Sequence, residues 1–250
     1  MAEETLSDKV AIITGGARRI GAHIGRALHA RGMRLVIHYR SSRDTARALQ
    51  TELNQARPQS VQLVSGDLLA GADFLRHLVS ETVKAFGRVD VLVNNASSFY
   101  PTPLEEATEK QWENLIGTNL KTPFFLAQAA APHLKAAQGC IVNMADIYGD
   151  LPLKRYPIYS AAKAGVIMLT RSLARELGPE VRVNAIAPGA IMWPEDGLDD
   201  AAKKRVIART VLKRTGVPED VSRAVLFLIA DGGYITGQVI RVDGGRSIFL

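Results

Sequence analysis

The stretch Thr14-Gly15-Gly16-Ala17-Arg18-Arg19-Ile20-Gly21 starts at the last residue of the apolar run Val10–Thr14 and leads into a helical pattern, Ile20–Arg31. A glycine turn between a strand and a helix presents backbone N–H groups and the positive helix end to a pyrophosphate. Such a motif is weak evidence when it stands alone. At the first strand–helix junction of a chain it predicts a dinucleotide site and a fold of alternating strands and helices.

The rest of the chain continues this alternation. Short apolar runs rich in β-branched residues predict further strands at Leu35–Tyr39, Val61–Val64, Val89–Asn94, Gly139–Met144, Val181–Ala187 and Gln238–Val242. Longer patterns predict helices at Thr45–Gln55, Ala72–Phe86, Thr108–Ala136, Ile158–Leu177 and Pro218–Ala230. Strands that are apolar almost throughout suit a parallel sheet covered on both faces. We expect one α/β domain over residues 1–250, a Rossmann-like, doubly wound parallel sheet of about seven strands with helices on both faces.

Two local signals refine this expectation. Thr108 and Gln111 have the spacing of a capping box, which predicts a helix start there. The stretch Pro188–Asp200 contains two prolines and two glycines and predicts a long loop. Because long loops at the ligand edge of such a sheet often act as lids, we expect a substrate lid over residues 188–214.

Composition sets the protein class. Of 250 residues, 47% are hydrophobic and 22% charged, and the single cysteine, Cys140, excludes an intramolecular disulfide. Acids stand at the start of the chain where a signal peptide has bases, and no apolar run approaches the ~20 residues of a membrane helix. We therefore expect a cytoplasmic protein with no membrane partner.

The net charge of +6 raises the question of a nucleic-acid partner. The basic residues are scattered, apart from one cluster that we interpret as a solvated helix face: Lys203, Lys204, Arg205, Arg209, Lys213 and Arg214. An anionic cofactor or substrate explains the charge more simply than a nucleic acid does. No metal site is expected.

The end of the second predicted strand indicates which cofactor is bound. It reads Ile37-His38-Tyr39-Arg40-Ser41-Ser42 and lacks the carboxylate that an NAD site uses for the ribose hydroxyls. His38, Arg40, Ser41, Ser42 and the nearby Arg18 offer donors to a 2′-phosphate instead. This favours NADPH/NADP+ over NADH, the alternative being an Arg40 that only covers the surface.

Further motifs stand at Asn94-Asn95-Ala96, Asn119, Tyr159-Ser-Ala-Ala-Lys163 and Pro188-Gly189. With the glycine turn, their order and spacing over the whole chain resemble the short-chain dehydrogenase/reductase family. The resemblance implies a homotetramer, an adenine contact at Asp67, a ribose contact at Lys163 and a water relay at Asn119. The candidate cofactor residues are Gly15, Arg18, Arg19, Ile20, Gly21, His38, Tyr39, Arg40, Ser41, Asp67, Leu68, Asn95, Ala96, Tyr159, Lys163, Pro188 and Gly189.

Within that family the chain is most similar to pteridine reductases and dihydromonapterin reductases. Arg19 replaces the usual middle glycine of the turn, and Asn95-Ala-Ser-Ser-Phe-Tyr-Pro-Thr-Pro103 looks very like a pteridine reductase segment. Asp146 stands 13 positions before Tyr159, where most relatives have a serine. The segments Tyr234-Ile-Thr-Gly and Val242-Asp-Gly-Gly245 also match.

Tyr159 and Lys163 are four residues apart and share one helix face. A phenol is a reluctant acid–base group at neutral pH, and an ammonium group one turn away stabilises its ionised form. Asp146 is informative because a carboxylate would repel the alkoxide that forms in ketone reduction. A carboxyl group beside a tyrosine can instead relay a proton to the nitrogen of a C=N bond. The alternative is that Asp146 forms a structural salt bridge.

We expect Phe99 to stack on a flat heteroaromatic substrate, with Ser97 and Arg19 beside it. Trp193 either caps the substrate or closes the lid. The candidate catalytic residues are Asp146, Tyr159, Lys163 and Asn119, and the candidate substrate residues are Arg19, Ser97, Phe99, Asp146, Tyr159 and Trp193.

The predicted activity is NADPH-dependent reduction of a small-molecule pterin, dihydropterin to tetrahydropterin, with folates as further substrates to test. The alternatives are a carbonyl reductase of the same family, acting on a 3-oxoacyl thioester or a sugar ketone, and a non-catalytic NADPH-binding protein.

Overall fold

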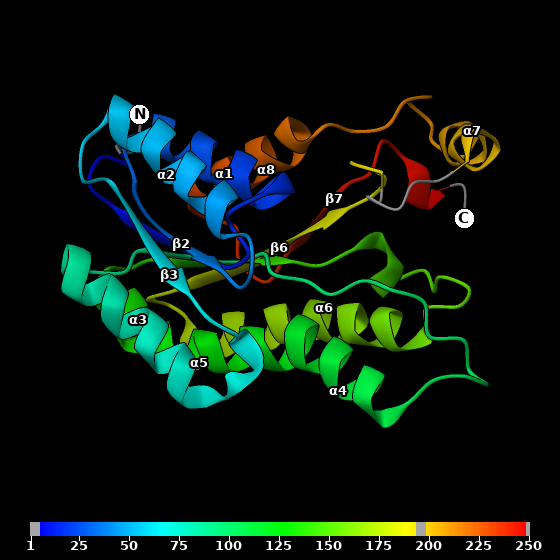
Figure 1. The fold of residues 1–250 in the computed structure, drawn as a ribbon, viewed down its shortest axis with the longest axis horizontal. Coiled ribbons are helices and arrows are strands. Elements are labelled where there is room, and N and C mark those ends of the chain that lie inside the picture. Colours follow the sequence, from blue (N-terminus) through cyan, green and yellow to red (C-terminus); the bar gives the residue numbers. More distant parts are fainter. Residues whose placement is uncertain (1–5, 194–198, 249–250) are drawn as a thin grey trace.

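In the computed structural model, which describes residues 6–193 and 199–248, seven parallel strands form one sheet (Figure 1). Their order is β3-β2-β1-β4-β5-β6-β7. The strands are β1 Val10–Ile13, β2 Arg34–Tyr39, β3 Val61–Ser65, β4 Val91–Asn94, β5 Cys140–Met144, β6 Arg182–Pro188 and β7 Val239–Val242. The expected Rossmann-like parallel sheet is confirmed, and every predicted strand is present within two residues of its expected ends.

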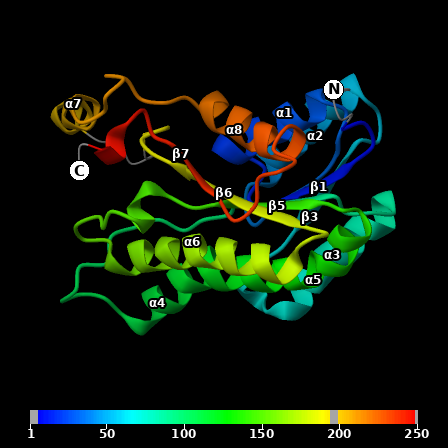
Figure 2. The same cartoon turned by 180° about the vertical axis from the view of Figure 1, so that it is seen from behind.

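Helices cover both faces of the sheet (Figures 1 and 2). One face carries α1 (Arg19–Ala30), α2 (Arg43–Ala56) and α8 (Pro218–Ala230), and the other carries α3 (Ala72–Phe86), α5 (Thr122–Ala136) and α6 (Pro157–Leu177). Successive strand residues alternate between two buried clusters, so that Ile13 packs toward the first set of helices and Ile12 toward the second. This two-sided burial explains why the strands are apolar almost throughout.

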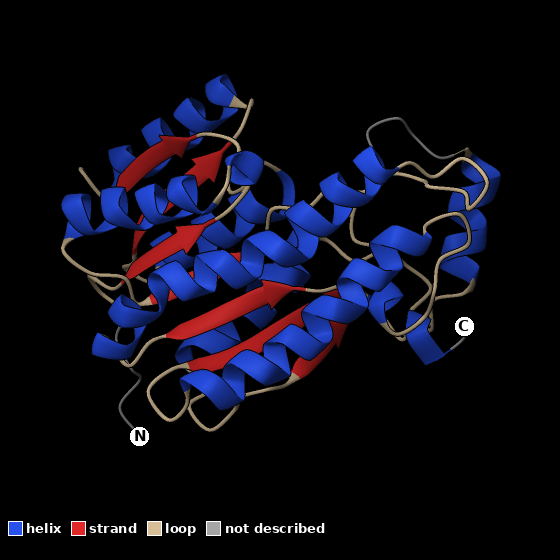
Figure 3. Ribbon diagram, turned by 90° about the horizontal axis from the view of Figure 1, so that it is seen from below, coloured by secondary structure: helices blue, strands red, loops and turns tan. Residues whose placement is uncertain are grey.

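The position of β1 in the sheet creates the ligand crevice. It pairs with β2 on one side and with β4 on the other. After β1 the chain enters α1 on one face of the sheet, whereas after β4 it continues to the helices of the opposite face (Figures 1 and 2). Figure 3 shows the strands side by side in one sheet with helices lying across it. The two connections diverge and leave a crevice at the carboxyl ends of these strands, where ligands bind in open α/β sheets.

The single helix predicted over Thr108–Ala136 was wrong in one respect. Helix α4 (Glu109–Ile116) and α5 are joined by a π-helical turn, η2 (Gly117–Lys121). The predicted capping box at Thr108 and Gln111 is present. A Cβ atom on Gly117 would lie 2.8 Å from Leu69 Cδ2, so the chain is closely packed where the helix changes its winding. A one-residue insertion of this kind leaves no trace in helical periodicity, and π-turns are frequent at functional sites.

The segment 188–214 contains a helix, α7 (Asp200–Ala208), whose N-cap residue Asp199 accepts the Ala202 N–H at 2.6 Å. It lies beside the C-terminal turn η4 (Arg246–Ile248) (Figure 1). Residues 194–198 of the predicted lid are outside the described part of the chain. None of the described helices is both long and apolar enough to span a membrane.

Candidate active site

The glycine turn after β1 is held in one conformation by close packing. Gly15 has a φ of +58°, a region that glycine enters without strain. At Gly21 a Cβ atom would lie 2.6 Å from both the Gly15 carbonyl oxygen and Asn95 Nδ2. Asn95, just after β4, donates to the carbonyl oxygens of Thr14 at 2.9 Å and Gly15 at 3.0 Å. These hydrogen bonds anchor the turn to the end of β4, and the start of α1 faces the crevice.

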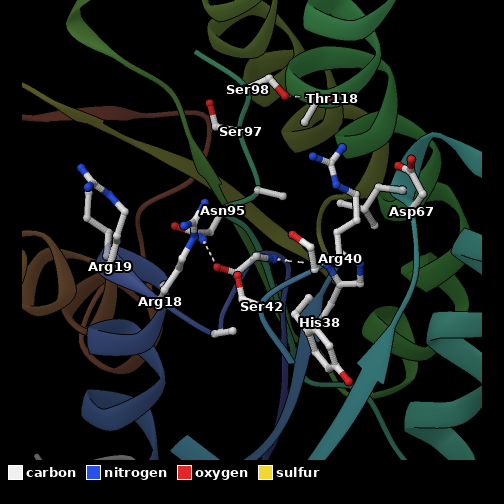
Figure 4. A pocket seen from close by; sticks show the side chains of 18 of the residues that line it. Arg18, Arg19, His38, Arg40, Ser42, Asp67, Asn95, Ser97, Ser98 and Thr118 are labelled. Atoms are coloured by element: carbon white, nitrogen blue, oxygen red, sulfur yellow. Dashed lines mark hydrogen bonds between the residues drawn. The ribbon is translucent and has the colours of Figure 1, made fainter. Parts of the chain in front are cut away.

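A cavity of about 330 Å³ lies beside this turn (Figure 4). It brings together most of the residues predicted to bind the cofactor: Gly15, Arg18, Arg19, Ile20, Gly21, His38, Tyr39, Arg40, Ser41, Asp67, Leu68, Asn95 and Ala96. Ala17 and Ser98, which lie inside the quoted motifs but were not named as candidates, also line it, as do Leu69 and Thr118, to which no motif pointed. Figure 4 shows Arg18 and Ser42 near the turn and Ser97 and Ser98 at the opposite end. A cavity lined from the glycine turn to Ser98 fits a dinucleotide.

Cationic and hydroxyl side chains line the part of the cavity next to β2. Arg40 and Ser41 follow β2 and are exposed, and both line the cavity with Arg18. Asp67, the candidate adenine contact, follows β3, and its carboxylate accepts the Leu69 N–H at 2.9 Å. No acidic residue follows β2 directly, so the position used by NAD-binding acids offers cationic and hydroxyl donors instead.

His38 has a different role from the one expected. Its Nδ1 accepts the Gly15 N–H at 3.3 Å, and its Nε2 is 3.1 Å from the Gly66 carbonyl oxygen, an arrangement that fits a neutral ring protonated on Nε2. The side chain is 2% exposed, and burial lowers its pKa. Both ring nitrogens are engaged within the protein, so His38 supports the turn rather than offering a donor to a phosphate.

Tyr159 and Asp146 form a hydrogen-bonded pair beyond the Ser97 end of the cavity. The Tyr159 hydroxyl donates to Asp146 Oδ2 at 2.7 Å. Asp146 follows β5 and caps the turn η3 (Ile147–Gly149), where its Oδ1 accepts the Tyr148 N–H at 2.9 Å. Tyr159 lies in the first turn of α6 and is 4% exposed. Neither contact of Asp146 is a salt bridge, and the carboxyl group faces the phenol.

The pKa shifts of this pair differ from the expectation of a stabilised phenolate. Burial, followed by the charge of Asp146, raises the pKa of Tyr159 well above its usual value. Burial also raises the pKa of Asp146 and outweighs the hydrogen bonds and cations around it. Lys163 donates to the Met144 carbonyl oxygen at 2.8 Å, lies 5.6 Å from the Tyr159 ring centre, and has its pKa lowered by burial to about 8. With both pKa values raised, Asp146 and Tyr159 retain their protons to higher pH than usual, and the two together are suited to act as an acid.

Asn119 and Ser97 extend this pair toward the cavity. Asn119 lies in the π-turn, and its Nδ2 donates to the carbonyl oxygens of Leu115 and Ser98, each at 2.9 Å. Its Oδ1 accepts the Ser97 hydroxyl at 2.6 Å, and Ser97 in turn lowers the pKa of Tyr159. A polar chain thus runs from Asn119 through Ser97 to Tyr159 and Asp146. It connects the cofactor cavity with the acidic pair.

Phe99 is 45% exposed and is not a core residue. Its ring stacks on Tyr156 with centres 4.6 Å apart and planes at 14°, and it meets the Tyr159 ring edge-on at 4.8 Å. Tyr156 was not singled out in the sequence, although it immediately precedes α6 and stands three residues before Tyr159. An aromatic surface therefore lies directly beside the acidic pair.

The predicted lid meets the glycine turn through Arg19. This residue has a φ of +51°, and its Nη2 donates to the Trp193 carbonyl oxygen at 3.3 Å. Pro188 ends β6, and the N–H of Gly189 donates to the Val242 carbonyl oxygen at 3.0 Å. These contacts bring the described start of the segment to the edge of the crevice.

The fold, the glycine turn, the cavity and the Tyr159–Lys163 pair together define an NAD(P)-dependent reductase of the Rossmann type. A family model described as Enoyl-(Acyl carrier protein) reductase matches residues 15–247, and the chain belongs to the short-chain dehydrogenase/reductase family.

Individual relatives do not separate the possible substrates. The chain is 37% identical to the 3-oxoacyl-(acyl-carrier-protein) reductase FabG of Staphylococcus aureus (strain N315), covering 95% of this chain and 97% of the relative. It is 36% identical to pteridine reductase 1 of Leishmania tarentolae, covering 96% of each. It is also 36% identical to the 3-oxoacyl-(acyl-carrier-protein) reductase of Synechocystis sp., covering 98% and 99%. Overall identity to the relatives named for the two substrates therefore differs by no more than one percentage point.

Proposed function

We propose that this protein is an NADPH-dependent pteridine reductase that converts a dihydropterin to a tetrahydropterin. The observation that carries the proposal is the 2.7 Å hydrogen bond between Tyr159 and Asp146. Reduction of a C=N bond needs a proton at nitrogen as hydride reaches carbon. A buried tyrosine and carboxyl group with raised pKa values hold such a proton ready.

Each residue of the site has a part in this reaction. The reduced nicotinamide, when bound, supplies the hydride. Tyr159 gives its proton to the ring nitrogen, and the proton of a neutral Asp146 moves to Tyr159. Lys163 supplies positive charge beside the pair, and Phe99 offers the exposed ring on which a flat pteridine stacks.

The second candidate is reduction of a 3-oxoacyl thioester, which the names of the bacterial relatives favour. A ketone oxygen gains negative charge as hydride arrives and needs hydrogen-bond donors. Both carboxyl oxygens of Asp146 accept hydrogen bonds within the protein, so Asp146 itself adds no donor for that ketone oxygen. This lack of a second donor beside Tyr159 is the reason to prefer the pteridine.

The proposal includes NADPH as the preferred cofactor, bound through Arg18, Arg40 and Ser41 around its 2′-phosphate. It also includes a homotetramer. Trp112 on α4 and Phe124 on α5 are 48% and 41% exposed, which leaves aromatic surface for contact with a second copy. Light scattering should give roughly four times the 27.1 kDa of the chain.

A paired turnover assay tests the function. NADPH is supplied with 7,8-dihydrobiopterin or with acetoacetyl-CoA, and oxidation is followed at the absorbance of the reduced nicotinamide. We expect kcat/KM for the dihydropterin to exceed that for the thioester by at least about tenfold, or ~1.4 kcal/mol in transition-state binding. The opposite preference would assign the protein to the carbonyl reductases.

A further inference from the structure

Arg246 is a buried cation that the proposed reaction leaves without a role. It begins the C-terminal turn η4 and is 7% exposed. Its Nη1 donates to the Val206 carbonyl oxygen of α7 at 3.0 Å, and its Nη2 donates to the Tyr148 hydroxyl at 3.3 Å. Within residues 6–193 and 199–248, no carboxyl group lies within salt-bridge distance of it. A buried guanidinium with only neutral partners is costly, so its position needs an explanation.

Tyr148 connects Arg246 with Asp146. The Tyr148 hydroxyl oxygen accepts the hydrogen bond from Arg246, and the Tyr148 backbone N–H donates to Asp146 Oδ1 at 2.9 Å. The positive charge of Arg246 lowers the pKa of Asp146 and opposes the effect of burial. The other groups acting on this carboxyl are Tyr159 and Lys163 from α6 and Tyr148 from η3.

We propose that Arg246 is a positioning residue for the proton relay, which holds Tyr148 against Asp146 and balances the negative charge that the Asp146–Tyr159 pair carries after donating its proton. In that step the Tyr159 Oη–H bond breaks as the proton binds the substrate nitrogen. The proton of Asp146 then forms the new Oη–H bond, and the carboxylate keeps the negative charge. Lys163, with a pKa of about 8, loses its charge in mildly alkaline solution, whereas an arginine stays charged throughout.

Two variants separate charge from contact. Arg246→Gln removes the charge and Arg246→Lys keeps it, while both shorten the side chain. Arg209→Gln is the matched control, because Arg209 is exposed just after α7 and also carries one positive charge. The carboxyl carbon of Asp146 is followed by NMR in protein labelled with [13C]aspartate, and its signal is identified by its loss in Asp146→Asn.

Removing a nearby cation raises the pKa of a carboxyl group, so Arg246→Gln should raise the titration midpoint of Asp146 by roughly one pH unit. Arg246→Lys and Arg209→Gln should leave the midpoint within a fraction of that shift. The loss of kcat toward alkaline pH should move upward with the midpoint in Arg246→Gln alone. A midpoint that is unchanged in Arg246→Gln, or that moves equally in all three variants, overturns the proposal.

A role in the relay rests on the proposed function, whereas the carboxyl titration does not. If dihydropterin is not reduced but the midpoint responds to Arg246, the substrate assignment fails and the action of Arg246 on Asp146 stands. Should both Arg246 variants fail to fold, Tyr148→Phe removes only the hydroxyl that Arg246 contacts. It should lower kcat and leave the NADPH dissociation constant unchanged, and an unchanged kcat overturns the positioning role.

Discussion

At the scale of single residues, Asp146 separates two kinds of reduction on one fold. Asp146→Ser should lower dihydropterin reduction by at least about tenfold, because the hydroxyl that remains cannot relay the proton of a carboxyl group. Serine can still cap the turn that follows β5, so the fold should persist. Steady-state rates measure the effect, and Asp146→Asn is the control that keeps the shape but not the proton. If the serine variant reduces dihydropterin as fast as the parent, Asp146 takes no part in the proton transfer.

Tyr159 is expected to be the group that delivers the proton. Tyr159→Phe removes one oxygen and little volume, and should lower kcat by about 10²–10⁴-fold, the usual contribution of general acid catalysis. NADPH binding, measured by fluorescence titration, should change little. A variant that keeps half of the parent rate would show that the proton comes from elsewhere.

Arg40 is expected to distinguish the two nicotinamide cofactors. NADPH should bind at least tenfold more tightly than NADH, which requires only about 1.4 kcal/mol. Arg40→Ala should narrow this ratio by weakening NADPH alone, since only NADPH carries the 2′-phosphate. Arg43→Ala is the control, because Arg43 is exposed nearby but does not line the cavity. Equal losses in both variants would indicate a general effect of surface charge.

At the scale of elements, the strands and most helices could be predicted because each follows from a local pattern. Apolar runs marked the seven strands, and Thr108 with Gln111 marked the start of α4. The π-turn could not be predicted, because one extra residue in a helical turn leaves no distinct mark in the periodicity of the sequence. The place of His38 was missed because its partners Gly15 and Gly66 come from other connections.

The glycine turn allows a prediction at the same scale. Gly21→Ala places a Cβ atom 2.6 Å from the Gly15 carbonyl oxygen, and backbone cannot move aside cheaply. We expect a loss of about 1–3 kcal/mol in unfolding free energy, as for overpacked cores, together with weaker NADPH binding. Gly25→Ala lies one turn later in α1 with its nearest atom at 3.5 Å. This control should be neutral or more stable by up to about 1 kcal/mol, measured by urea unfolding.

At the scale of the whole molecule, the site is assembled from residues that lie far apart in the sequence. The sequence motifs identified Asn119, Asp146, Tyr159 and Lys163 as candidates. In the structure, hydrogen bonds join Tyr159 to Asp146 and Ser97 to Asn119. Arg246 had no such signal, because its importance arises only where the end of the chain meets η3 and α7. The upward shift of the Tyr159 pKa could not be predicted either, since it depends on how deeply the fold buries the phenol.

Global stability should therefore depend on pH through Lys163, whose folded-state pKa of about 8 lies below its usual value of 10.5. Between these values the unfolded chain binds more protons than the folded one, so unfolding free energy should rise with pH. Below pH 8 the cost of burying the ammonium is present in full. Asp146 contributes with the opposite sign, beginning at lower pH, since burial raises its pKa above 3.8.

Urea unfolding of the cofactor-free protein at several pH values between 8 and 10 should show a gain of about 2 kcal/mol, since each pKa unit is worth about 1.4 kcal/mol. Lys163→Met removes the charge and keeps most of the volume, so its stability should be nearly flat over this range. It should also be higher than that of the parent near pH 7, where the parent pays for a buried ammonium. Above about pH 10 both proteins should lose stability together, because Tyr100 and Tyr159 bind their protons more tightly when folded. If the two proteins instead follow parallel curves from pH 8 to 10, Lys163 stays charged in the folded state and compensates its burial through the Met144 carbonyl oxygen.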